Sequence, residues 1–145
     1  MGTVSSIEEK AIKATLDRVA KALRDKDLDA LAACYSPGVE IFDVGSQLTG
    51  VDSLRRLWKS VFPYFPEPIE IQRRDVKIIG HDGVAVVTCF TRLTGMKTDH
   101  PSARAWIRTS SCLKKIDGEW KIFHEHASMP VDCDEDRIDY LLDAG

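Results

Sequence analysis

The stretch IEIQRRDVKIIGHDGVAVVTCFTRL, residues 69–93, decides the fold of this chain. Apolar and polar residues alternate along 69–79 and again along 84–93, and this period of two is typical of β-strands. Asp82 and Gly83 stand between the two runs, where an Asp-Gly pair is the strongest short signal of a β-hairpin. The stretch therefore predicts two long antiparallel strands.

The same pattern occurs once more towards the C-terminus. Residues 103–116 and 119–128 alternate in the same way, and Asp117 and Gly118 lie between them. The two hairpins together predict a four-stranded antiparallel meander in the second half of the chain.

The first half of the chain is predicted to be mainly helical. Apolar residues recur every three or four positions along 6–24, 28–35 and 51–62, as on one face of an α-helix. A short strand is expected at 39–44, after the Ser-Pro-Gly sequence at 36–38 ends the second helix. Helices followed by a meander indicate the α+β class.

The composition excludes several kinds of protein. The chain has 145 residues, 43% hydrophobic and 30% charged, with a formal net charge of −3. No run approaches the roughly 20 apolar residues of a membrane span. No stripe of Lys and Arg interleaves with aromatic residues, as nucleic-acid-binding proteins require. We therefore expect neither a membrane nor a nucleic acid as partner.

The cysteines and the C-terminal residues bear on location and domain division. None of the four cysteines forms a C-x-x-C pair, so we expect free thiols and a cytoplasmic protein. Residues 1–130 are expected to form one domain and residues 131–145 an acidic tail. That tail is expected either to dock through one helical turn or to be disordered.

Three segments follow one another along the chain: RVAKALRDKDLDALAACYSPGVEIFDVG (18–45), LTGVDSLRRLW (48–58) and KKIDGEWKIFHEHASMP (114–130). Together they resemble the SnoaL-like / ketosteroid isomerase-like superfamily, the cone fold also called nuclear-transport-factor-like. The resemblance implies a cystatin-like cone, with N-terminal helices packed in the concave face of a strongly curved, mainly antiparallel sheet. The fold carries isomerases, cyclases, dehydratases, hydrolases and non-catalytic modules, so it does not fix the function.

The strands also indicate a second subunit. They carry apolar residues on both faces, so one face is expected to meet the helices and the other a partner copy. A homodimer is therefore expected, with Trp120 packed between the subunits.

Asp43 is the first candidate catalytic residue. The resemblance places it at the position of the ketosteroid isomerase general base, and a carboxylate that faces an apolar cavity is suited to proton transfer near neutral pH. The alternative is that its side chain caps the turn that follows. The two enolate-stabilising donors of ketosteroid isomerases fall on Val19 and Ser110 here, so neither is retained.

Arg108 and Glu125 complete the expected catalytic set. Arg108 shares one strand face with Trp106 and Ser110, and the resemblance turns that face into the pocket. An arginine there would bind a carboxylate or a developing oxyanion. The alternative is an internal ion pair of Arg108 with Asp43 or Glu125.

Which side chains of the last strand face the pocket depends on the register of that strand. The resemblance puts Phe123 and Glu125 inside the cone and leaves His124 and His126 on the outer face, and a bulge would reverse this. His-x-His also places two imidazoles on one face, as zinc requires, but a catalytic zinc site usually has three protein ligands. Packed histidines are therefore preferred, and we expect no metal and no cofactor.

These residues lead to one expected function and one alternative. The expected function is small-molecule binding, with a cofactor-free acid/base lyase, isomerase or cyclase acting on a small apolar or aromatic carbonyl compound. Asp43 would move the proton, Arg108 would hold the anionic oxygen and Glu125 would assist. The alternative is a non-catalytic dimeric ligand-binding or assembly module. The expected ligand-binding residues are Trp58, Phe62, Cys89, Thr91, Trp106, Ser110 and Phe123, of which Phe62 is better explained as core.

Overall fold

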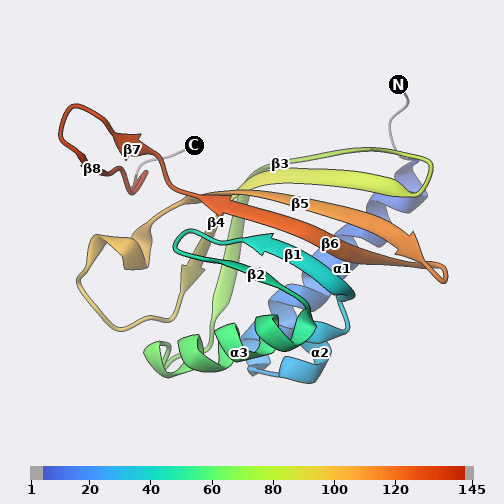
Figure 1. Cartoon of the computed structure of the whole chain (residues 1–145), viewed down its shortest axis with the longest axis horizontal. Coiled ribbons are helices and arrows are strands. Elements are labelled where there is room, and N and C mark those ends of the chain that lie inside the picture. Colours follow the sequence, from blue (N-terminus) through green and yellow to red (C-terminus); the bar gives the residue numbers. More distant parts are fainter. Residues whose placement is uncertain (1–4, 143–145) are drawn as a thin grey trace.

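The computed structural model describes residues 5–142 and has helices packed against a curved six-stranded sheet (Figure 1). The predicted α+β class is confirmed. The elements are α1 (Ser6–Asp25), α2 (Leu28–Ala32), β1 (Tyr35–Phe42), β2 (Gln47–Thr49), α3 (Val51–Val61), η1 (Phe62–Tyr64), β3 (Glu70–His81), β4 (Val84–Thr94), η2 (Pro101–Arg104), β5 (Ile107–Ile116), β6 (Glu119–Ser128), β7 (Val131–Asp132) and β8 (Arg137–Ile138).

The sheet has the strand order β2-β1-β6-β5-β4-β3. β1 pairs with β6 in parallel, whereas the other neighbouring strands run antiparallel. Both predicted hairpins are present. The two residues of each Asp-Gly turn have positive φ, from 50° at Asp82 to 82° at Gly118, which matches the right-handed twist of the paired strands.

Helix α1 lies across the concave face of the sheet (Figure 1). Its first turn is capped by Ser5, whose hydroxyl accepts a hydrogen bond of 3.2 Å from the backbone N–H of Glu8. The periodic apolar face, with Ile12, Leu16 and Val19, is buried in the core. The sequence period therefore locates this helix correctly.

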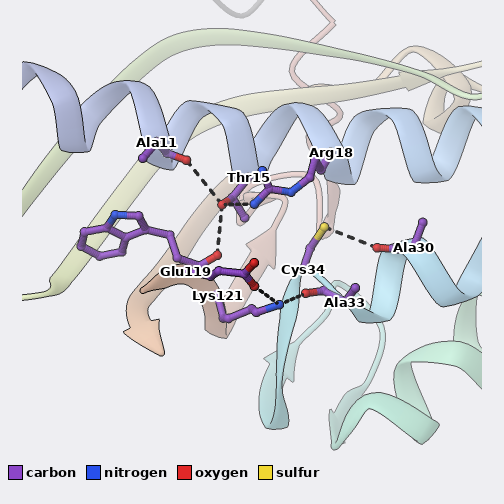
Figure 2. A network of polar contacts seen from close by, with 9 residues as sticks. Ala11, Thr15, Arg18, Ala30, Ala33, Cys34, Glu119 and Lys121 are labelled. Carbon is purple, nitrogen blue, oxygen red and sulfur yellow. Dashed lines mark hydrogen bonds and ion pairs between the residues drawn. The ribbon is translucent and has the colours of Figure 1, made fainter. Parts of the chain in front are cut away.

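Polar contacts fasten α1 to the β5–β6 hairpin (Figure 2). The buried Thr15 hydroxyl donates to the backbone oxygen of Trp120 at 3.0 Å, and Nη2 of Arg18 donates to the same hydroxyl at 2.9 Å. Trp120 is 2% exposed and belongs to the core of its own chain, so the expectation that it packs between subunits is wrong.

Two expected boundaries differ from the structure. The Ser-Pro-Gly sequence lies inside β1, where the pairing with β6 is irregular between Tyr35 and Glu40, instead of ending a helix. Residues 103–106 precede β5, because the proline at 101 starts the short 3-10 helix η2.

Two irregularities decide which side chains face the helices. In β3 the pairing shifts between Arg74 and Lys77, and Asp75 has a φ of 53°. In the β5–β6 pair the register shifts between Cys112 and Leu113, which makes Phe123 an extra residue in β6. Each bulge changes which positions of the strand face inward.

The end of the chain forms a small hairpin of β7 and β8, set apart from the main sheet (Figure 1). Tyr140 continues from it, and its backbone oxygen accepts a hydrogen bond of 3.2 Å from the N–H of Trp106. The helical turn expected here is absent as far as residue 142, and residues 143–145 lie outside the described part. None of the helices within residues 5–142 combines the length and the hydropathy that a membrane crossing requires.

Candidate functional site

A cavity of about 350 Å³ lies between α1, α3 and the concave face of the sheet. This volume is near the lower end of the range of roughly 300–1,000 Å³ for small-molecule sites, and the mostly apolar lining with a few polar groups is also typical of them. Its apolar wall includes Val19, Leu54, Trp58, Val87, Ile107 and Ile122.

Glu125 is the central polar group of this cavity. Its Oε1 accepts a hydrogen bond of 2.9 Å from the Tyr35 hydroxyl, and its Oε2 accepts one of 3.0 Å from the Ser111 hydroxyl. Burial raises the pKa of Glu125 above its ordinary value, and the two hydrogen bonds and the charge of Arg73 only partly oppose this. The carboxyl is thus held in place while its charged form is disfavoured.

Tyr35 is a permanent donor to that carboxyl. It is 6% exposed, and burial together with the adjacent charge of Glu125 raises the pKa of its hydroxyl well above the ordinary value. The hydroxyl therefore keeps its proton at any physiological pH and fixes the orientation of Glu125.

Asp43 follows the last residue of β1 and also lines the cavity. The turn after it is closed by the backbone, since the N–H of Asp43 donates to the oxygen of Ser46 at 2.8 Å. Within residues 5–142 the carboxylate of Asp43 has no hydrogen bond, so a turn-capping role for this side chain has no support.

Arg73 is a cavity residue that the sequence analysis missed. It lies on β3 before the bulge and lines the cavity, and its Nη2 donates to the backbone oxygen of Leu16 at 3.3 Å. The signal was present in the sequence. Ile69 is buried and Ile71 lines the cavity, so the alternation of this strand turns Arg73 inward as well.

Arg108 lies on the opposite face of the sheet, so its expected place in the pocket is wrong. Its side chain is exposed, and Nε donates to the hydroxyl of Ser128 at 3.2 Å. The cavity is lined by Thr109 and Ser111 of β5, and Ser110 does not line it. An error of one residue in the assumed register turns every side chain of a strand to the other face.

Trp106 is buried but does not line the cavity either. Its ring lies under two guanidinium groups, with Cζ of Arg92 at 4.5 Å and Cζ of Arg74 at 5.0 Å from the ring centroid. This cation–π arrangement gives Trp106 a structural role just before β5.

In β6 the bulge separates Phe123 from Glu125. Ile122 and Glu125 both line the cavity, so the extra residue Phe123 lies on the outer side, where Nζ of Lys114 is 5.3 Å from its ring. The expected position of Phe123 in the pocket is therefore wrong, whereas Glu125 lies in the cavity.

The two histidines stay on the outer side of β6 or at the rim. Nδ1 of His124 lies 3.0 Å from Oε1 of Glu40, and its ring meets Phe42 edge-on. His126 borders the cavity but is exposed. In the part of the chain that the structure describes, no three His, Cys, Asp or Glu side chains gather as metal ligands.

The remaining expected residues are divided between the cavity and the core. Trp58 lines the cavity, and Phe62 packs against its ring without lining the space. Cys89 and Thr91 lie on the cavity wall, where Sγ of Cys89 is 3.2 Å from Oγ1 of Thr109 and the two threonine hydroxyls are 2.9 Å apart.

A second, more open cleft lies between α1, α2 and the β5–β6 turn, with a volume of about 660 Å³ (Figure 2). Four of its six charged side chains form ion pairs, Lys21 with Asp25 at 2.5 Å and Lys121 with Glu119 at 3.1 Å. The smaller cavity combines a mostly apolar wall with the side chains of Glu125, Asp43 and Arg73, so we take it as the candidate site.

Comparison with known proteins identifies the type of domain. The model of the SnoaL-like domain matches residues 12–132. No curated protein sequence matches the chain significantly.

Several solved structures are similar to the whole chain. An NTF2-like protein of unknown function from Pseudomonas putida KT2440 is 22% identical, with a TM-score of 0.84 over 97% of this chain and 99% of that one. A proposed scytalone dehydratase from Novosphingobium aromaticivorans DSM 12444 is 17% identical, with a TM-score of 0.72 over 83% of each chain. A protein with a cystatin-like fold from Nostoc punctiforme PCC 73102 is 12% identical, with a TM-score of 0.76 over 97% and 98%. At these identities the similarity shows the cystatin-like cone fold alone.

Proposed function

Because the chain belongs to the SnoaL-like domain family, we propose that its cavity binds a small molecule and catalyses proton transfer on it without a cofactor. The substrate is a small apolar or aromatic carbonyl compound, and the reaction is that of an isomerase, lyase or cyclase. A proposed dehydratase among the structural neighbours is in keeping with this class of chemistry.

One observation carries the proposal, namely a carboxyl group enclosed in an apolar cavity with a raised pKa. Glu125 is held by two hydroxyl donors, and burial raises its pKa above the ordinary 4.5. A raised pKa makes a carboxylate a stronger base for taking a proton from carbon. Glu125 therefore replaces Asp43 as the main proton carrier.

The chemical step balances with this one group. The ionised carboxylate of Glu125 removes a proton from the carbon next to the carbonyl, which gives an enolate and a neutral Glu125. Where a carbon–carbon double bond is conjugated with the enolate, the neutral acid returns the proton to the far carbon of that double bond, which completes an isomerisation. In a lyase it protonates a departing hydroxyl, which leaves as water. Asp43, directly after the end of β1, is the second carboxylate of the cavity.

Deuterium exchange tests this step directly. Wild type, Glu125→Gln and Asp43→Asn are incubated in D2O with enolisable carbonyl compounds, 2-tetralone and phenylpyruvate, and exchange at the carbon next to the carbonyl is followed by NMR. We expect catalysed exchange by the wild type and a loss of about 100-fold or more in Glu125→Gln, as for other general acid–base groups. Glu70→Gln, on the exposed start of β3, is the matched control.

The outcome also decides between catalysis and binding alone. Exchange at the buffer rate with a compound that stabilises the wild type would refute the proton-transfer proposal. The protein would then be the non-catalytic module, with the hydrogen bonds of Glu125 serving the structure. Thermal stabilisation by phenols, naphthols and small aromatic acids supplies the binding measurement.

We also propose that the chain forms a homodimer through the outer face of the sheet. Exposed apolar side chains gather there, and Ile79 and Val86 are direct partners across β3 and β4, 59% and 38% exposed. Such a patch is typical of an interface. Sedimentation equilibrium should give twice the monomer mass for the wild type and the monomer mass for Ile79→Glu; a monomeric wild type would refute the proposal.

A further inference from the structure

Arg73 brings a positive charge to the cavity that no neighbouring carboxylate neutralises by contact. Among residues 5–142, none of the ion pairs within 4.0 Å includes Arg73. Its hydrogen bond goes to the neutral backbone oxygen of Leu16. Arg55, by comparison, is paired with Asp29 at 2.5 Å on the surface.

A guanidinium that lines a mostly apolar cavity is stabilised by an anion. Removing a charge from water is costly unless an opposite charge or full hydrogen bonding replaces the solvent. Glu125 is close enough for the charge of Arg73 to lower its pKa, but no ion pair within 4.0 Å joins the two side chains. Asp43 lies on the same cavity but does not contact Arg73 within 4.0 Å.

The chemistry of the group favours a carboxylate. The planar fork of an arginine donates two parallel hydrogen bonds to the two oxygens of a carboxylate. Arg73 is the one cationic side chain of the described cavity lining, apart from the exposed His126 at the rim. One guanidinium balances the charge of a monoanion, whereas a phosphate dianion would leave one negative charge unbalanced in a mostly apolar cavity.

We propose that the ligand of the cavity is a compact apolar carboxylic acid, bound through its carboxylate by Arg73. This inference rests on the proposed function and narrows its substrates to carbonyl compounds that carry a carboxylate. The apolar wall holds the body of the molecule, and its enolisable carbon faces Glu125.

Matched acids and amides test the inference without any mutation. Isothermal titration calorimetry measures the binding of benzoate, cinnamate and 2-naphthoate, each beside its amide, which has nearly the same shape and no charge. We expect the wild type to bind at least one acid about 10-fold or more tightly than its amide, a difference of about 1.4 kcal/mol. Equal affinities, or no binding by any of the acids, would overturn the inference.

Variants of Arg73 test whether this residue causes the preference for acids over amides. Arg73→Gln should bring the ratio of acid to amide affinity close to one, and Arg73→Lys should keep a smaller preference, because it retains the charge without the fork. Arg56→Gln, an exposed arginine of α3, should leave the ratio unchanged. A full acid preference in Arg73→Gln would contradict the inference. If Arg73→Gln fails to fold, Arg73→Lys and the wild-type comparison still decide.

The two proposals fail separately. Catalysed exchange without an acid preference refutes the role of Arg73 and leaves proton transfer standing. An acid preference without exchange supports Arg73 and refutes the catalytic role of Glu125.

Discussion

Replacing Glu125 with glutamine should stabilise the protein relative to wild type by an amount that grows as the pH rises. Burial is the largest influence on this carboxyl, and it raises the pKa above the ordinary 4.5. In the unfolded chain the same carboxyl ionises at its ordinary pKa. Between these two values the unfolded state has lost a proton that the folded state keeps, which favours unfolding of the wild type. Glutamine does not ionise, so the variant escapes this effect.

The size of the effect follows from proton linkage. At its steepest, the stability difference between variant and wild type changes by about 1.4 kcal/mol per pH unit for a single group. The total is about 1.4 kcal/mol for each unit by which folding raises the pKa. Each kcal/mol corresponds to roughly 3 °C in melting temperature for a chain of this size. Well below pH 4.5 the difference should be constant, because the carboxyl is then protonated in both states.

Urea unfolding of both proteins between about pH 4 and about pH 8 measures the difference at each pH. Glu70→Gln is the control, because it removes the same carboxylate from an exposed position of β3. Its difference from wild type should change little over this range.

The direction in which the stability difference changes with pH shows whether folding raises or lowers the pKa of Glu125, because two effects compete there. Burial raises its pKa, whereas the hydrogen bonds from Tyr35 and Ser111 and the charge of Arg73 lower it. A variant that loses stability relative to wild type as the pH rises would show that the lowering effects win. The basis for Glu125 as a proton carrier would then be refuted.

Three further changes test the packing and the backbone. Tyr35→Phe removes a hydrogen bond to Glu125 and should cost about 1–3 kcal/mol in urea unfolding at neutral pH, and an unchanged midpoint would contradict that bond. Leu113→Ala empties a fully buried position and should cost about 2–5 kcal/mol by the same assay; a cost below 1 kcal/mol would place Leu113 outside the core. Gly95→Ala should lower the melting temperature in a thermal scan, because the φ of Gly95 is +111° and a Cβ would lie 2.6 Å from the backbone oxygen of Pro68. An unaffected melting temperature would show that the backbone relieves this contact without cost.

The fold was predictable from sequence because its determinants are local. The two Asp-Gly pairs fix the hairpins through turn geometry, and the apolar face of α1 follows the helical period over 20 residues. The Ser-Pro-Gly sequence misled because proline and glycine are tolerated in a strand where its pairing is irregular, as it is in β1.

The site was predictable only in part, because strand register is not a local property. Asp43 and Glu125 reach the cavity as the resemblance implies, but Arg108 and Phe123 do not. The shift that displaces Phe123 arises between β5 and β6, and the pattern of one strand does not reveal it. Arg73 was missed because an arginine in an alternating strand is usually assigned to the solvent face.

A relative whose last long strand lacked the extra residue at Phe123 would reach the position of Glu125 with one residue fewer. A correct alignment of the two would then place a gap at Phe123, and an ungapped alignment would equate Glu125 with an outward-facing neighbour. An alignment by residue count would then match the relative's cavity carboxylate to a histidine beside Glu125, although the two cavities were the same. Homologous positions in this domain are therefore better matched by cross-strand partners, such as Ser111 opposite Glu125, than by sequence spacing.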